Sequence, residues 1–193
     1  MSRTQEFDAN EALDRAVALF WEKGFLDSSM DDLVKATGVS RYGIYGTFGN
    51  KREFFKASLR RYVDRIVSHM QRPLRKRDAS LAEIQEYFAK LLQLAGSDRG
   101  RLGCLICNTA TEVAPHDEDV GRAVRAVFDE YSRVFKRALR NAQARGEIGK
   151  DCDISALAWY LTGVIQGVAV MVRAGYGKER IREFVKVAMR TLR

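Results

Sequence analysis

The sequence predicts an all-α fold of about nine helices, divided into a small N-terminal domain (residues 1–52) and a larger helical domain (residues 53–193). Three observations predict it. Only two prolines, Pro73 and Pro115, interrupt 193 residues, and proline is the residue that most often ends a helix. Apolar residues recur at the three- and four-residue spacing of helices, without the alternation typical of strands. The composition, 46% apolar and 30% charged, favours a packed core over a disordered chain.

The first helix is predicted to begin at a capping residue, Asp8 or Asn10, and to end at Gly24. Its apolar residues follow helical spacing: Leu13, Ala16, Val17 and Phe20. Ser28 or Ser29 then caps a short helix whose first turn contains acidic residues, which suit the positive end of the helix dipole. One face of this second helix is apolar and carries Met30, Leu33 and Val34.

The next two boundaries are predicted at glycines. Gly38 and Val39 end the second helix, Ser40 caps a very short third helix, and Gly49-Asn50 separates it from a long helix that begins at Lys51. A glycine between two short helices allows the left-handed backbone of a sharp turn, and Val39 can fill the angle between them. This arrangement predicts a helix-turn-helix, whose second helix can enter the major groove of DNA.

Residues 32–51 carry the motif in a specific form. The pair Ile44-Tyr45 is followed by Phe48, three positions after the tyrosine, and by Lys51 at the start of the next helix. Together with the end of the first helix, residues 18–25, this pattern resembles the signature of the TetR/AcrR family over about residues 8–60. The resemblance implies a transcriptional regulator that binds a palindromic double-stranded operator as a homodimer. Repression is the family default, and activation stays open.

The resemblance also implies which residues contact DNA. Candidates for base contact are Arg41, Tyr42 and Thr47. Candidates for phosphate contact, which fixes the register without reading sequence, are Ser29, Ser40, Tyr45 and Lys51. Arginine can read guanine through two hydrogen bonds, and a tyrosine ring can pack on a thymine methyl group. The alternative is that these side chains are solvated or only pack between helices.

The charge distribution gives a second, weaker indication. The net charge is +8, yet residues 1–60 carry nine basic and nine acidic side chains and are neutral as a whole. Residues 33–60 carry six basic residues against one acidic residue, so positive charge is expected around the DNA-reading helix.

Beyond residue 60 the sequence predicts a linker or helix end at Pro73 and the basic run 75–77, followed by five helical segments. Those segments cover residues 80–95, 104–113, 117–145, 154–173 and 178–192. Apolar stripes on the last two predict a dimer interface formed by four helices, two from each chain. Its predicted residues are Leu157, Leu161, Gly163, Ile165, Gly167, Val168, Phe184 and Ala188. The alternative is that both stripes pack inside one chain.

Residues 154–172 run for 19 positions without a charge, which is just long enough to span a bilayer. Polar residues and two glycines in this segment, and its helical periodicity, favour a buried interface helix over a membrane span. The first seven residues lack the apolar core of a signal peptide, and three cysteines in a chain of this type suggest free thiols in a reducing compartment. The expected location is cytoplasmic, with no membrane partner.

Two cysteines lie in the run from Gly103 to Thr109, which resembles a Gly-Cys-Leu-x-x-Asn-Thr motif in one branch of the same family. Some members of that branch are thought to sense electrophiles or oxidants through the cysteine, which here is Cys104. The alternative is that Cys104 and Cys107 are small core residues. If both are helical, a disulfide between them is unfavourable, because their Cβ atoms stand too far apart. A metal site with His116 lacks a fourth ligand and a standard spacing, so no metal and no cofactor are predicted.

A reversible apolar or aromatic effector is the other possibility for the helical domain. The residues able to line its pocket are Phe88, Leu92, Tyr131, Phe135, Trp159 and Tyr160, although such residues more often belong to a plain core. The identity of this small molecule is open. An effector of either kind releases DNA only if it binds better to a dimer whose two reading helices no longer match the operator.

An enzyme is the main rival class, and the sequence disfavours it. The chain has two histidines, no glycine-rich phosphate loop and no serine nucleophile motif. A thiol enzyme based on Cys104 is the least unfavourable version.

Overall fold

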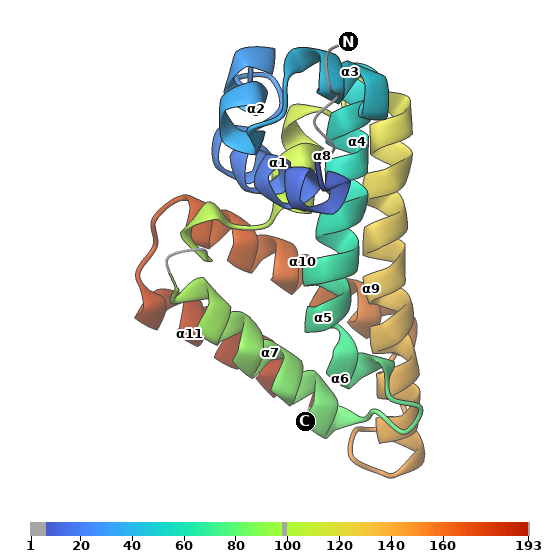
Figure 1. The fold of residues 1–193 in the computed structure, drawn as a ribbon. Coiled ribbons are helices and arrows are strands. Elements are labelled where there is room, and N and C mark those ends of the chain that lie inside the picture. Colours follow the sequence, from blue (N-terminus) through green and yellow to red (C-terminus); the bar gives the residue numbers. More distant parts are fainter. Residues whose placement is uncertain (1–6, 98–99, 193) are drawn as a thin grey trace.

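Helices form all the regular secondary structure of residues 7–97 and 100–192, the part of the chain that this computed structural model describes (Figure 1). The N-terminal helices are α1 (Ala9–Lys23), α2 (Met30–Thr37) and α3 (Arg41–Phe48), which lie at one end of the molecule. α4 (Lys51–Tyr62) runs from them into the rest of the protein and continues without a break through a π-helical segment, η1 (Val63–Val67), into α5 (Ser68–Met70). The all-α prediction is confirmed.

The predicted capping residues set the helix starts. The carboxylate of Asp8 accepts hydrogen bonds from the first turn of α1, and Ser29 forms a capping box with Asp32 on α2. Ser40 and Asn50 accept from the backbone of Gly43 and Glu53, at the starts of α3 and α4. These bonds satisfy N–H groups that have no partner inside a helix, so each boundary is fixed by residues at that boundary.

Gly38, at the turn between α2 and α3, has φ 73° and ψ 5°. We expect Gly38→Ala to lower the free energy of unfolding by about 1–2 kcal/mol, because an L-residue is strained in this conformation. Crowding adds nothing, since a Cβ there would lie 3.5 Å from its nearest neighbour, an Arg15 nitrogen. Gly46→Ala is the matched control in α3, where a Cβ would meet nothing within 4 Å and stability should rise by about 0.5–1 kcal/mol. Urea denaturation of both variants measures the difference; equal changes of stability would contradict the strain.

The core of the N-terminal domain is built from phenylalanines of α1, α3 and α4. Phe20, fully buried, packs edge-on against Phe55 with ring centroids 5.0 Å apart. Phe54 stacks on Phe48 at 4.4 Å. Leu33 and Ile44 are 0% exposed and anchor α2 and α3 to this cluster. The position of the DNA-reading helix therefore depends on aromatic packing behind it.

After α5 comes the four-residue helix α6 (Arg72–Arg75), which contains Pro73 in its first turn. The remaining helices are α7 (Leu81–Ala95), α8 (Leu105–Glu112), α9 (Glu118–Ala144), α10 (Ile154–Arg173) and α11 (Lys178–Arg190), with a 3-10 turn, η2 (Gly100–Leu102), before α8. α9 packs along α10, and α7 lies beside α11 (Figure 1). When α4, η1 and α5 count as one helix, the described residues contain ten helices; α6 is the one that the sequence did not predict.

The structure divides the predicted dimer stripe into two faces. Leu161, Ile165, Val168 and Ala188 are at most 7% exposed and belong to the core of the single chain; Leu157 and Gly167 are partly covered, and Gly163 is exposed. The apolar residues left at the surface of α10 and α11 lie on the adjoining face: Trp159, Tyr160, Val170, Phe184 and Val187. The four buried residues of the predicted stripe therefore pack inside the single chain, whereas Gly163 and Phe184 remain accessible to a second chain.

By length and composition, α10 is the one helix of the described residues that could cross a membrane, and 39% of its most apolar window is buried inside the protein. Its contacts with α9 and α11 place its buried apolar side in the core of the protein.

Candidate nucleic-acid interface and cysteine site

α3 presents a row of uncovered side chains at the N-terminal end of the molecule. Tyr42 is 81% exposed and Tyr45 is 45% exposed, and Arg41 and Thr47 are also exposed. Among the described residues, no side chain beyond its two chain neighbours and no backbone atom outside α3 lies within 4 Å of a Cβ added at Gly46, so this face of the helix lets another surface approach the backbone closely. Large exposed aromatic rings on a short helix are the pattern of a binding surface rather than of a core.

Ser29 and Ser40 are exposed, and each caps a helix. The Ser29 hydroxyl accepts from the Asp32 backbone at 3.0 Å, and the Ser40 hydroxyl accepts from the Gly43 backbone at 3.1 Å. Both hydroxyls therefore sit beside the free N–H groups of a helix N-terminus, an arrangement that suits a phosphate group.

The two cationic candidates have partners within the protein. An Arg41 nitrogen lies 2.7 Å from an Asp31 carboxylate oxygen, and both side chains are more than half exposed, so the ion pair is weak in water. Lys51 Nζ lies 4.5 Å from the centroid of the Phe25 ring, and partial burial lowers the pKa of Lys51 from its ordinary value. The contact of Lys51 with the Phe25 ring thus combines packing with the attraction between a cation and an aromatic ring.

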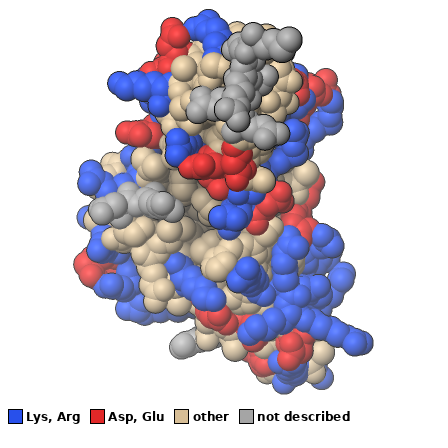
Figure 2. All heavy atoms as spheres, viewed as in Figure 1, with Lys and Arg blue, Asp and Glu red and all other residues tan. Residues whose placement is uncertain are grey.

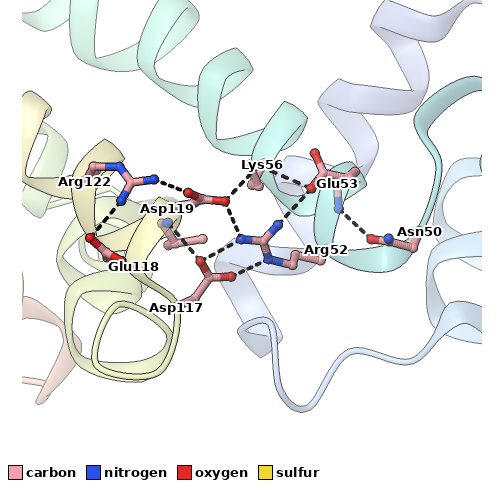
Figure 3. Close-up of polar contacts among 9 residues, drawn as sticks. Asn50, Arg52, Glu53, Lys56, Asp117, Glu118, Asp119 and Arg122 are labelled. Carbon is pink, nitrogen blue, oxygen red and sulfur yellow. Dashed lines mark hydrogen bonds and ion pairs between the residues drawn. The ribbon is translucent and has the colours of Figure 1, made fainter.

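Two further basic residues of this region, Arg52 and Lys56, connect α4 to the start of α9 (Figure 3). Arg52 donates to both oxygens of Asp117, at 2.5 and 2.8 Å, and to Asp119 at 2.8 Å. Lys56 Nζ lies 3.2 Å from Glu53 and 3.8 Å from Asp119. The positive charge expected near the DNA-reading helix is therefore partly used to join the start of α4 to the start of α9.

This contact makes stability depend on pH. The Arg52 guanidinium, as hydrogen-bond donor, lowers the pKa of Asp117 to about 2. The carboxylate stabilises the fold fully above its unfolded pKa of about 3.9, and this contribution is lost as the pH falls toward 2. We expect Asp117→Asn, which keeps the α9 cap, to cost about 1 kcal/mol at pH 7, since solvent screens the 39% exposed Arg52. Urea unfolding at pH 7 and at about pH 2 checks this; an equal cost at both values would contradict it.

The excess positive charge of the molecule lies away from α3. Figure 2 shows Lys and Arg gathered around the opposite end, where α6 and the later part of α9 lie. A concave surface there is lined by five basic residues and one acidic residue: Arg75, Glu130, Arg133, Lys136, Arg137 and Arg140, with Val134.

Cys104 occupies the position just before α8, with extended backbone angles of φ −120° and ψ 124°. Its sulfur accepts a hydrogen bond from the Tyr62 hydroxyl at 3.6 Å, and that hydroxyl accepts from the Leu105 backbone at 3.4 Å. The side chain of Cys107 and backbone N–H groups of the first turn of α8 stabilise the thiolate of Cys104 and lower its pKa to about 6. Cys104 therefore has the environment of a reactive thiolate. The pKa of Cys107 is raised by its hydrogen bond to Cys104 and by burial.

Cys104 also lines a cavity of about 50 Å³ between α4, α7, α9 and α10. Tyr62, Tyr87 and Tyr131 contribute to its wall, which is otherwise apolar. Of the predicted pocket residues only Cys104 and Tyr131 line it. Phe88 and Phe135 are fully buried and stack on each other at 5.9 Å. Cys107 and Leu92 lie outside the lining, and Trp159 is 51% exposed.

Two polar contacts connect the surroundings of this cavity to the N-terminal domain. Glu112, the last residue of α8, accepts from the Leu26 backbone at 2.7 Å. Arg173, at the end of α10, donates to the carbonyls of Trp21 and Leu102 at 3.4 Å and of Glu22 at 3.2 Å. Glu112 therefore links the end of α8 directly to the N-terminal domain, whereas Arg173 bridges α1 and the Leu102 carbonyl, two residues before Cys104.

Sequence reasoning missed Tyr62, Tyr87, Glu112 and Arg173. Their partners are residues at least 40 positions away in the chain or backbone carbonyl groups. Contacts of these two kinds leave no local pattern in the sequence. A weak signal exists for Tyr62, because it is the one tyrosine among the apolar positions of a long helix that follows the helix-turn-helix.

Comparison with known protein families covers most of the chain. Residues 12–58 match "Bacterial regulatory proteins, tetR family", and residues 80–188 match "Tetracyclin repressor-like, C-terminal domain". The HTH-type transcriptional repressor ComR of Escherichia coli (strain K12) is 32% identical, over 97% of this chain and 90% of ComR. An uncharacterized HTH-type regulator, YezE of Bacillus subtilis (strain 168), is 28% identical over the full length of both chains.

Solved structures agree with these relatives. A cysteine mutant of the TetR family transcriptional regulator CifR, in complex with 26-bp double-strand operator DNA, superimposes with a TM-score of 0.88 at 27% identity, covering 99% of this chain and 100% of CifR. The reduced form of Escherichia coli NemR, at 19% identity, shares the fold with a TM-score of 0.78, over 94% of this chain and 93% of NemR.

Proposed function

Because this chain belongs to the TetR family and is a DNA-binding transcriptional regulator, we propose that it represses genes by reading a palindromic operator with α3 and leaves the operator when its C-terminal domain is modified or occupied. The observation that carries this proposal is the exposed face of α3, where the side chains of Tyr42 and Tyr45 are 81% and 45% exposed. Arg41, Tyr42 and Thr47 read bases. Ser29, Ser40, Tyr45 and Lys51 hold phosphates.

Selection of bound sequences from a random DNA pool tests the proposal. The full chain in reducing buffer should enrich one palindrome, with two half-sites separated by about one helical turn or a multiple of it. Binding to that palindrome should weaken steeply with salt. Failure to enrich any palindrome would rule out sequence-specific reading by a symmetric dimer.

We assign the dimer interface to the exposed apolar face of α10 and α11, defined by Trp159, Tyr160, Gly163, Val170, Phe184 and Val187. Its large side chains are 39% to 60% exposed. A Cβ added at Gly163 would meet nothing within 4 Å, so a second helix can approach the backbone there. Contiguous exposed apolar side chains of this size are typical of protein–protein contacts.

We expect Gly163→Glu to weaken dimerisation by about 100-fold or more, because each chain would bury one unpaired carboxylate in the proposed interface. The chain itself should fold normally, since Gly163 points away from it. Gln93→Glu, an exposed position on α7, is the control with the same charge change. Sedimentation equilibrium measures both; an unchanged dimer for Gly163→Glu would place the interface elsewhere.

Release from DNA is proposed to pass through three connections between the domains. They are Arg52 to Asp117 and Asp119, Glu112 to the Leu26 backbone, and Arg173 to the last turn of α1. A change at Cys104 or in the tyrosine-lined cavity moves α8 or α10, and these contacts transmit the movement to α1 and α4. Two reading helices that shift in opposite senses in a dimer lose their match to the operator.

Two expectations from the sequence remain part of the proposal. The division into a DNA-binding unit (1–52) and an effector and dimerisation unit (53–193) describes the roles of the two parts, although α4 belongs structurally to both. A cytoplasmic location suits a regulator that binds DNA. The relatives found are transcriptional regulators, and no catalytic role is proposed for Cys104.

A further inference from the structure

The sequence Cys104-Leu105-Ile106-Cys107 places two thiols at the start of α8. A disulfide between them is unfavourable only if both residues are helical, and the structure shows that Cys104 is not. It stands at the N-cap with extended angles, while Cys107 is the third helical residue. Side chains at an N-cap fold over the first turn toward the third residue. The Cα atoms of two such positions are about 5 Å apart, inside the range of about 4.4–6.8 Å that disulfides need.

The two cysteines have different surroundings. Cys104 lines the cavity and accepts a hydrogen bond from Tyr62. Cys107 is 9% exposed, packs in the core and is absent from the cavity wall. The pKa of Cys104 is lowered while that of Cys107 is raised. One thiol is therefore suited to attack an oxidant, and the other stays protonated beside it, ready to react in a second step.

The cavity suits a small oxidant. Its volume of about 50 Å³ admits a molecule of the size of a few waters, which includes hydrogen peroxide. Cys104 and the three tyrosines bring polar groups to a wall that is otherwise apolar.

We propose that Cys104 and Cys107 form a reversible dithiol–disulfide pair, closed across the first turn of α8 by hydrogen peroxide that enters the tyrosine-lined cavity. The inference rests on the proposed function, because the disulfide is the signal that releases the operator. It adds Cys107 as the resolving residue and a peroxide as the chemical class of effector.

The reaction proceeds in two balanced steps. The Cys104 thiolate attacks one peroxide oxygen, so an S–O bond forms, the O–O bond breaks, and the departing hydroxide takes a proton to become water. Cys104 is then a sulfenic acid. The Cys107 sulfur attacks the Cys104 sulfur, an S–S bond forms, the S–O bond breaks, and the leaving hydroxide takes the Cys107 proton. In total, two thiols and one peroxide give one disulfide and two waters.

The position of the pair explains how its closure would reach the N-terminal domain. The bond constrains the first turn of α8, next to the Leu102 carbonyl that Arg173 holds together with α1. The last residue of the same eight-residue helix, Glu112, binds the Leu26 backbone at 2.7 Å. A rotation or shift of α8 therefore changes one contact with α1, made through Arg173, and one contact with the segment that follows α1, made at Leu26.

The test treats the full-length protein with hydrogen peroxide and maps its disulfides by mass spectrometry of peptides, without DNA. We expect an intrachain link between Cys104 and Cys107 that dithiothreitol reverses. Cys107→Ser should instead accumulate a sulfenic acid on Cys104 that dimedone traps, and Cys104→Ser should lose the reaction. Cys152→Ser, in the loop before α10, is the matched control and should behave as the unmodified chain does.

Affinity for the selected operator is measured separately on the same samples. Peroxide should weaken binding by about 5- to 150-fold, reversibly, in the unmodified chain and in Cys152→Ser but not in Cys104→Ser. A link from Cys104 to Cys152 or to a second chain, or a stable sulfenic acid in the unmodified chain, overturns the inference and leaves operator binding by the reduced protein intact. If the Cys104–Cys107 disulfide forms but the affinity for the operator does not change, the disulfide is not the release signal. If the reduced protein selects no operator, the proposed function fails while the mapped link still stands.

Discussion

Arg41→Ala is expected to weaken binding to the selected operator by about 2–6 kcal/mol. Arg41 is the first residue of α3 and is exposed, where it can donate two hydrogen bonds to one guanine. Each such pair contributes about 1–3 kcal/mol of discrimination, and a homodimer carries two copies. Fluorescence anisotropy titrations over a salt series measure the loss. If Arg41 reads a base, the variant loses preference at one position of each half-site with little change in salt slope.

Asp31→Asn is the matched control for Arg41. In the free protein Asp31 holds the guanidinium at 2.7 Å, and binding DNA requires this exposed ion pair to open. Removing the carboxylate should tighten binding by less than about tenfold, the scale of a surface ion pair. Unchanged affinity and base preference in Arg41→Ala would mean that Arg41 serves only the pair with Asp31.

Phe20→Ala is expected to lower the free energy of unfolding by about 3–5 kcal/mol, the usual cost of removing a buried phenylalanine ring. Phe20 is fully buried, and its ring meets Phe55 at 5.0 Å and both Phe25 and Phe54 at 6.4 Å. The cavity would open where α1 crosses α4, so the N-terminal domain should melt first. Chemical denaturation followed by circular dichroism measures the loss.

Phe20→Leu keeps most of the buried volume and should cost less than about half as much. Phe128 on α9 is only partly buried. Phe128→Ala therefore measures the cost of removing a phenylalanine ring that does not lie at the centre of the core. If Phe20→Ala costs no more than Phe128→Ala, the phenylalanine cluster is not what holds α1 to α4.

The N-terminal domain could be predicted closely because each of its boundaries depends on neighbouring residues. Asp8, Ser29, Ser40 and Asn50 cap the helices that follow them, and Gly38 has the left-handed backbone that the turn requires. Caps and glycine turns act within four residues, so they are legible in a single sequence.

The dimer face was harder to predict because α10 is apolar on more than one side. Leu161 and Trp159 both belong to apolar rows, yet the first is fully buried in the chain and the second is 51% exposed. The periodicity of a helix shows that an apolar row exists. It does not show whether another helix of the same chain or a second chain covers that row. The Cys104–Tyr62 contact and the contact from Glu112 to the Leu26 backbone depend on how α8 lies against α1 and α4, which no local pattern encodes.

The uneven placement of charge affects how the protein finds its operator. Residues 1–60 are neutral overall, so the whole net charge of +8 resides in residues 61–193, with a dense group at the end opposite α3 (Figure 2). At distances beyond the Debye length for the solution, attraction toward a polyanion acts mainly on that far end. First encounters with DNA therefore often occur in an orientation that cannot read it. Raising the salt concentration should slow the association of this protein less than its net charge suggests, and its search should depend on reorientation after contact.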